Sequence, residues 1–205
     1  MTPSGILFVI SAPSGAGKTS LVNALVQSVK NVKISISHTV RPKRPGEQHG
    51  VNYHFVTKEI FQEMQAEDMF LESAEVFGNL YGTSKAWVEK VLAEGRDVLL
   101  EIDWQGAQQI RQKMPQSVSI FIIPPSRETL LNRLNIRDQD DEKVIQLRMK
   151  GVKNEISHYH EYDYLICNDK FEDALEDLKI IVRSNRLQTK RQIMPYATLI
   201  KKLLS

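Results

Sequence analysis

One stretch near the start of the chain joins an apolar run, a glycine-containing loop and a Lys-Thr pair. The run covers residues 6–10 (Ile-Leu-Phe-Val-Ile), and the loop that follows leads directly to Lys18 and Thr19. Strand, loop and helix in this order are the context that a phosphate-binding loop needs. Glycines let the backbone fold around phosphate oxygens, and the positive end of the next helix faces the same anion. The stretch therefore predicts a site for a nucleotide triphosphate.

The end of this loop carries two side chains that can act on such a nucleotide. Lys18 can reach the β- and γ-phosphates, and the Thr19 hydroxyl can bind Mg²⁺. The loop departs from the pattern G-x-x-x-x-G-K-[ST] at its first position, where Ala12 replaces glycine. A residue with a Cβ fits there only if its φ is negative, so we expect a negative φ at Ala12.

The composition of the 205-residue chain is typical of one globular domain. Hydrophobic residues make up 41% and charged residues 25%, so the chain can build a core. A net charge of +2 does not favour nucleic acid as a partner, and one cysteine excludes a disulfide framework. The first apolar run is too short for a signal peptide or a membrane span. We therefore expect a cytoplasmic protein that binds neither nucleic acid nor membranes.

The rest of the chain alternates between strand-like and helix-like apolar spacing. This alternation is typical of an α/β fold with a parallel sheet and helices on both faces, in which ligands bind beyond the C-terminal strand ends. Residues 37–84 interrupt it with short strand patterns, which predict a small strand-rich insertion. The predicted strands outside the insertion are 6–10, 32–36, 98–103, 118–123 and 164–167. The predicted helices include 84–94, 105–114, 141–159, 171–188 and 194–204.

The insertion contains two groups that could recognise a nucleotide. Arg41 and Arg44 lie in a proline-stiffened loop and can donate to a phosphate together with the Tyr53 hydroxyl; the alternative is a solvated basic loop. Glu72 interrupts an apolar stretch, and a carboxylate can accept both adjacent N–H donors of guanine, a pair that adenine lacks. A hydroxyl such as that of Ser37 could then meet guanine O6. The alternative is an outward glutamate on a two-sided strand.

Two further groups lie after the insertion. Glu101 and Asp103 alternate with apolar residues at a strand end, so both point to one face, where they suit the water shell of Mg²⁺ or orientation of an acceptor. Helix capping or a salt bridge is the alternative. Arg133, Arg137 and Arg148 bracket the polar segment 135–141, which suggests a lid that closes over ATP; ordinary surface arginines are the alternative.

Taken together, these motifs resemble the guanylate kinases of bacterial type over residues 6–187. The shared motifs include Ala-Pro-Ser-Gly-Ala-Gly-Lys-Thr (12–19), Ser-x-x-x-Arg-x-x-Arg-x-Gly-Glu (37–47), Phe-Leu-Glu (70–72), Gly-Asn-x-Tyr-Gly-Thr (78–83), Glu-Ile-Asp-x-Gln-Gly (101–106) and Tyr-Asp-Tyr-Leu-Ile-x-Asn-Asp (162–169). The resemblance implies a P-loop nucleoside monophosphate kinase fold within one domain. Its expected parts are a core (1–36, 85–125, 150–205), a GMP-binding subdomain (37–84) and a lid (126–149).

The resemblance also implies an activity: transfer of the γ-phosphoryl group of ATP to GMP or dGMP, with Mg²⁺, in purine nucleotide metabolism and GMP recycling. ATP and GMP are then the expected partners, and a homo-oligomer is compatible with the family. The residues implied to act in catalysis are Lys18, Arg41, Arg137 and Arg148. Those implied to bind ATP are Ala12, Pro13, Ser14, Gly15, Ala16, Gly17, Lys18, Thr19, Ser20, Arg133 and Asn168. Those implied to bind GMP are Ser37, Arg41, Arg44, Tyr53, Glu72, Tyr81, Thr83 and Asp103.

The implied metal site consists of Thr19, with Glu101 acting through a water of the ion's shell. The sequence departs from the family at Ala12 and at Asp138, where similar proteins often carry glycine. Two other functions share parts of this pattern. One is a catalytically inactive module that recognises a phosphorylated peptide, and the other is a related kinase acting on a different phosphorylated acceptor.

Overall fold

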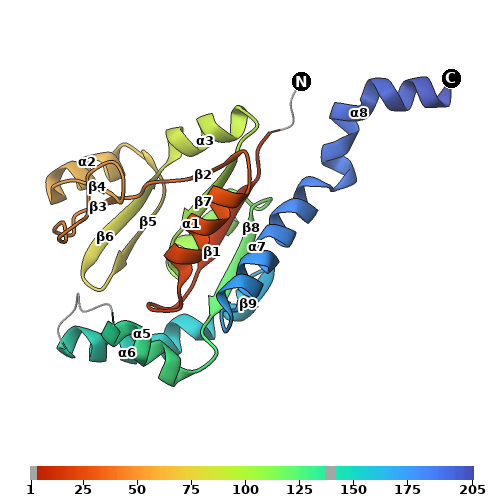
Figure 1. The fold of residues 1–205 in the computed structure, drawn as a ribbon. Coiled ribbons are helices and arrows are strands. Elements are labelled where there is room, and N and C mark those ends of the chain that lie inside the picture. The colour runs from red at the N-terminus through yellow and green to blue at the C-terminus, as the bar shows by residue number, and fades with distance from the viewer. Residues whose placement is uncertain (1–3, 137–141) are drawn as a thin grey trace.

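A five-stranded sheet forms the centre of the protein in the computed structural model, which describes residues 4–136 and 142–205 (Figure 1). The strand order is β2-β7-β1-β8-β9, and every neighbouring pair is parallel. The fold is therefore the predicted parallel α/β arrangement. The strands are β1 (Leu7–Ser11), β2 (Val32–Ile34), β7 (Asp97–Glu101), β8 (Val118–Ile123) and β9 (Tyr164–Cys167).

Helices cover both faces of this sheet because its central strand is apolar on both sides. In β1, Phe8 and Ile10 pack with Leu21 of α1 (Lys18–Ser28) and with α7 (Phe171–Arg186). The alternate residues Leu7 and Val9 pack with α3 (Lys85–Ala93) and α4 (Trp104–Lys113) on the other face. A continuous apolar run is what a parallel strand buried on both faces requires. This central packing fixes the C-terminal ends of β1 and β7 side by side.

The insertion after β2 forms its own four-stranded sheet with the order β4-β3-β6-β5. Its elements are β3 (His38–Thr39), β4 (His54–Phe55), α2 (Lys58–Ala66), β5 (Phe70–Val76) and β6 (Asn79–Ser84). Thr57 caps α2, as its sequence position indicates, by accepting a hydrogen bond from the backbone N–H of Ile60. The β5–β6 turn consists of residues 77–78, since Val76 pairs with Asn79.

Two helices lie next to the phosphate loop, α5 (Arg127–Ile136) and α6 (Glu142–Ser157), and the tip of the β5–β6 hairpin points toward α6 (Figure 1). Arg137 and Asp138 lie outside the described residues, and so does the side chain of Arg148. After a short 3₁₀ turn (Tyr159–Glu161), the chain passes through β9 and α7 into α8 (Thr189–Leu204), which extends away from the sheet. Across residues 4–136 and 142–205, no helix is both long and apolar enough to cross a membrane.

Candidate active site

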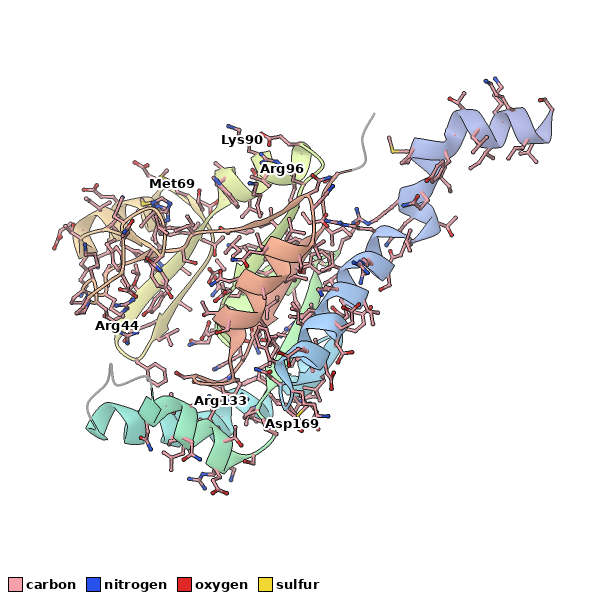
Figure 2. All side chains as sticks on the ribbon, in the orientation of Figure 1. Arg44, Met69, Lys90, Arg96, Arg133 and Asp169 are labelled. Carbon is pink, nitrogen blue, oxygen red and sulfur yellow. The ribbon has the colours of Figure 1, made fainter. Side chains whose placement is uncertain are left out.

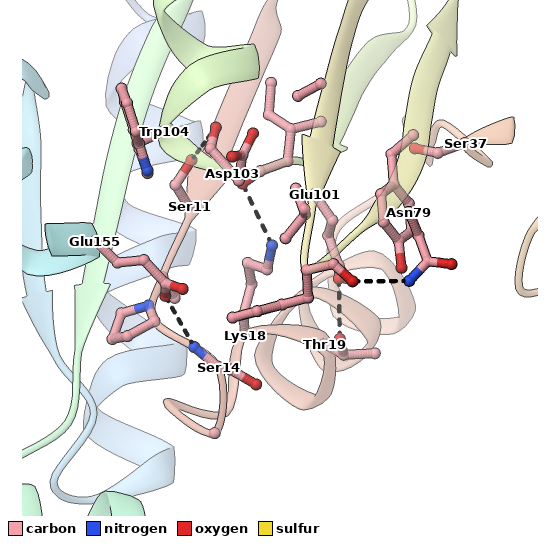
Figure 3. A pocket seen from close by; sticks show the side chains of 18 of the residues that line it. Ser11, Ser14, Lys18, Thr19, Ser37, Asn79, Glu101, Asp103, Trp104 and Glu155 are labelled. Carbon is pink, nitrogen blue, oxygen red and sulfur yellow. Dashed lines mark hydrogen bonds between the residues drawn. The ribbon is translucent and has the colours of Figure 1, made fainter. Parts of the chain in front are cut away.

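A cavity of about 430 Å³ lies between the phosphate loop, the insertion and the segment that follows β7 (Figure 3). Its walls come from sequence segments that are far apart, and they contain most of the predicted site residues. The residues of that prediction that line the cavity are Ala12, Pro13, Ser14, Gly15, Gly17, Lys18, Thr19, Ser37, Arg41, Arg44, Tyr53, Glu72, Tyr81, Glu101 and Asp103.

The phosphate loop has the backbone geometry of an anion site. Gly15 and Gly17 have φ values of 90° and 91°, a region that residues with a Cβ rarely adopt. Ala12 is not among the described non-glycine residues with positive φ, which confirms the expectation for that position. Gly17 precedes α1 and no side chain caps that helix, so its first N–H groups remain available to a ligand.

The two polar side chains after the loop are directed at the C-terminal end of β7 (Figure 3). Lys18 Nζ donates to the carbonyl oxygen of Ile102 at 3.4 Å, and Thr19 Oγ1 donates to Glu101 Oε2 at 3.0 Å. A hydroxyl beside a carboxylate is a set of oxygen donors that suits a hard divalent cation such as Mg²⁺.

Arg133 and Asn168 hold the phosphate loop from behind and do not line the cavity. Asn168 Nδ2 donates to the carbonyl oxygen of Ala16 at 2.7 Å, and Arg133 donates to the carbonyl oxygens of Ala16 and Asn168. A Cβ at Gly17 would lie 2.4 Å from Asn168 Nδ2, so this packing also requires glycine there. Figure 2 shows Arg133 on α5 and Arg44 in the insertion, on separate parts of the molecule. Ser20 is exposed and lies outside the cavity wall.

The insertion contributes a buried acid, Glu72, which is 2% exposed. Thr83 Oγ1 donates to Glu72 Oε1 at 2.6 Å, so the predicted base-binding threonine contacts the carboxylate and does not line the cavity. Burial raises the pKa of Glu72 to about 7 despite the hydrogen bond from Thr83, and the nearby charge of Asp103 adds to this rise. The prediction of an inward carboxylate is correct, and the alternative of an outward one is excluded.

Asp103 differs from the sequence prediction, which placed it with Glu101 on one face of a strand. The strand β7 ends at Glu101, and Asp103 caps α4 by accepting a hydrogen bond from the backbone N–H of Gly106 at 3.0 Å. The alternative of helix capping is therefore correct for this residue. Both carboxylates still line the cavity, because the chain turns from strand to helix at its edge.

A cluster of cations and aromatic rings forms another wall of the cavity. Arg41 Nη2 donates to Glu47 Oε1 at 2.7 Å, and the guanidinium lies 5.3 Å from the centroid of the Tyr53 ring. The Tyr53 and Tyr81 rings are 5.8 Å apart. Burial favours the neutral form of Glu47, but the hydrogen bonds from Arg41 and from the Arg44 backbone N–H hold the pKa of Glu47 below its usual value. An ionised Glu47 can thus orient Arg41 toward an anion.

Sequence reasoning missed several residues of this site. Glu47 belongs to a recognised motif, but its bond to Arg41 depends on the fold of the loop. Gly106 allows α4 to approach the acid, since a Cβ there would lie 2.5 Å from Glu72 Oε2. Gly106 and the lining residue Asn79 both belong to recognised motifs, 101–106 and 78–83, but no role was predicted for either. Further lining residues whose identity no motif specifies are Phe77, Trp104 and Glu155.

Comparisons with known proteins identify the family. The family model described as Guanylate kinase matches residues 4–185. The guanylate kinase of Saccharophagus degradans is 58% identical over 205 residues, which cover all of both chains. That of Alcanivorax borkumensis is 56% identical over 100% of this chain and 99% of its own. The crystal structure of guanylate kinase from Anaplasma phagocytophilum superposes with a TM-score of 0.79 at 37% identity, covering 93% of this chain and 90% of the other. The chain belongs to the guanylate kinase family.

Proposed function

We propose that the protein transfers the γ-phosphoryl group of ATP to GMP, and to dGMP, giving ADP and the guanosine diphosphate. The observation that carries the proposal is that one cavity holds a phosphate loop together with a buried carboxylate and two arginines. The loop suits a nucleotide triphosphate, the carboxylate suits guanine, and the arginines suit the phosphate of the acceptor. Full-length relatives named as guanylate kinases support the same activity.

Recognition of the acceptor would rest on the insertion, residues 37–84. Glu72 would accept hydrogen bonds from N1–H and the exocyclic amine of guanine, with Thr83 fixing the carboxylate and Ser37 near O6. Arg41, Arg44, Tyr53 and Tyr81 would hold the phosphate. Asp103 would help to position the base from the start of α4, since it lines the same cavity.

Binding of the donor would rest on residues 12–20 and the helix that follows them. Lys18 would bridge the ATP phosphates, while Arg133 and Asn168 hold the loop in shape from behind. Mg²⁺ fits beside Thr19 and Glu101, where it would neutralise phosphate charge. The lid, residues 126–149, would supply Arg137 and Arg148, a role that rests on the family motifs.

Positioning and charge stabilisation would carry the rate of this reaction. The GMP phosphate oxygen attacks the γ-phosphorus in line, through a loose transition state whose charge Lys18 and the arginines neutralise. No general base is required, because a phosphate monoester is already largely ionised near neutral pH. We place this reaction in the cytoplasm, as part of purine nucleotide metabolism and GMP recycling.

A coupled assay of ADP release with GMP, dGMP, AMP, CMP and UMP tests the proposal. We expect efficient turnover with GMP and dGMP, and little with the other nucleotides. Preference for another acceptor would indicate a related kinase, and no turnover with any of them would indicate a binding module. Either result would overturn the proposed function.

A further inference from the structure

The tip of the β5–β6 hairpin contains an aromatic residue in a conformation that suits it poorly. Phe77 and Gly78 form the two-residue turn, with φ values of 48° and 75°. Positive φ at both positions is the pattern of a type I′ turn, in which asparagine, aspartate or glycine is favoured first. A bulky residue with positive φ is an outlier, and Phe77 remains 42% exposed, so burial does little to offset this strain.

The Phe77 ring lies against a second locally unfavourable residue, Gly151 of helix α6. A Cβ added at Gly151 would lie 3.6 Å from Phe77 Cε1 and 3.8 Å from Phe77 Cζ, which is ordinary van der Waals distance. Glycine in a helix interior destabilises the helix relative to alanine, and the backbone at Gly151 is not in the left-handed region that would require it. Two residues that break local conformational preferences therefore meet where the insertion contacts helix α6.

The same helix also contacts the phosphate loop, one turn further along. Glu155 Oε2 accepts a hydrogen bond from the backbone N–H of Ser14 at 3.2 Å (Figure 3). Because residues i and i+4 share one face of a helix, Gly151 and Glu155 point in the same direction. Helix α6 therefore links the tip of the insertion to the loop that holds the donor nucleotide. Violations of local preference at such a junction are expected where function requires them.

We propose that Phe77 is a positioning residue that couples the two substrate sites. Its ring bridges the acceptor-binding insertion to α6, and Glu155 carries the link to the phosphate loop. If ATP at the phosphate loop fixes α6, the insertion loses less conformational freedom when GMP binds, so GMP should bind more tightly. By thermodynamic linkage, GMP should tighten ATP binding by the same factor. This inference rests on the proposed function, since it assigns Phe77 a role in binding ATP and GMP together.

The test is calorimetric titration of GMP with and without a non-transferable ATP analogue and Mg²⁺. In the unmodified protein we expect the analogue to tighten GMP binding. Phe77→Asn should reduce that tightening roughly two- to tenfold, the worth of one aromatic contact. GMP affinity without the analogue should stay within about twofold, and the melting temperature should not fall, because asparagine suits this turn.

Three further variants sharpen the test. Phe77→Tyr keeps the ring and should retain the coupling, while Gly151→Leu should displace the ring and lose it as Phe77→Asn does. Val51→Asn removes an exposed apolar side chain elsewhere in the insertion and should change nothing. Steady-state kinetics should show a raised KM for GMP at saturating ATP in Phe77→Asn, with full recovery in Phe77→Tyr.

Three results would overturn the inference. The first is the absence of coupling in the unmodified protein. The second is unchanged coupling in Phe77→Asn, and a lower melting temperature beside it would make the role of Phe77 structural. The third is an equal loss of GMP affinity with and without the analogue, which would make Phe77 a direct contact of GMP. If the unmodified protein does not phosphorylate GMP at all, the proposed function fails together with this inference.

Discussion

Thr83 Oγ1 donates a 2.6 Å hydrogen bond to Glu72 Oε1 inside the insertion, where both side chains are buried. The two residues are paired directly across β5 and β6, so the sheet register sets their geometry. Gly106 of α4 lies close to the other carboxylate oxygen. Neighbours thus hold the acid in one orientation, and the burial that restricts it also raises its pKa to about 7.

GMP affinity should therefore depend on pH near neutrality. In the proposed site, Glu72 would accept both guanine donors only when it is ionised, so the Kd for GMP should rise about tenfold per pH unit below its pKa of about 7. Titration of the GMP phosphate adds a further dependence near pH 6. The Glu72→Gln variant should retain only the dependence that comes from the GMP phosphate. The difference between its pH profile and that of the unmodified protein therefore measures the contribution of Glu72. Identical profiles would contradict this assignment.

Protein stability should change with pH in the direction opposite to GMP affinity. The pKa of Glu72 is raised from 4.5 in the unfolded chain to about 7 in the folded one. Its stabilising contribution is therefore complete below pH 4.5 and is lost as pH rises through about 7. Urea titrations should show Glu72→Gln gaining stability relative to the unmodified protein between pH 5 and pH 8.

Thr83→Val should move the pH dependence of kcat/KM for GMP to higher pH. The Thr83 hydrogen bond favours the ionised form of Glu72, so its removal raises the pKa of that carboxyl again. At pH 7 we expect kcat/KM for GMP to fall about tenfold, with recovery at higher pH. Thr83→Ser keeps the hydroxyl and serves as the control. A Thr83→Val profile with an unchanged midpoint would argue against this role.

Glu72→Gln should remove guanine selectivity, because it replaces one acceptor by a donor that would face the N–H groups of guanine in the proposed site. We expect kcat/KM for GMP to fall about 10²–10³-fold, while the low activity with AMP changes little. Glu75→Gln on the exposed side of the same strand is the matched control. The ADP-release assay with both nucleotides measures the effect, and unchanged GMP efficiency would refute the role.

Lys18→Ala should abolish most turnover while leaving the fold intact. The ammonium contacts the Ile102 carbonyl oxygen at the cavity and would stabilise charge on the transferred group. We expect kcat to fall about 10²–10³-fold with little change in melting temperature. Lys30→Ala, an exposed lysine just after α1, controls for loss of charge. A near-normal kcat in Lys18→Ala would exclude its assignment.

Asp97→Ala should destabilise the fold without altering the site. Asp97 is buried and accepts hydrogen bonds from the backbone N–H of Ile6 and from Arg186 Nε, both at 2.7 Å. Its removal leaves both donors without this acceptor, which costs about 3 kcal/mol of unfolding free energy. Asp177→Ala on the exposed face of α7 should cost less than about 0.5 kcal/mol. Urea titration measures both, and a small effect of Asp97→Ala would contradict this interpretation.

The contiguous features of the site could be predicted from the sequence. The apolar run, the glycines and Lys18 follow one another along the chain, so local backbone rules are enough to specify strand, loop and helix. The negative φ at Ala12 follows from the same rules. The alternation of strands and helices predicted the parallel sheet, because each period reflects the geometry of one element.

Tertiary structure decided the features that depend on distant partners. The sequence alone left Glu72 either inward or outward, and the choice depends on Thr83 across the hairpin and Gly106 on another helix. Asn168 lies behind the phosphate loop because it bonds to Ala16, 152 positions earlier in the chain. Such contacts leave no periodic signal, since packing of separate elements brings the partners together. For this protein, the sequence alone therefore determined the phosphate loop, because its parts are contiguous. Tertiary packing decided the inward orientation of Glu72 and the contact between Phe77 and Gly151, because these depend on elements that are distant in the chain.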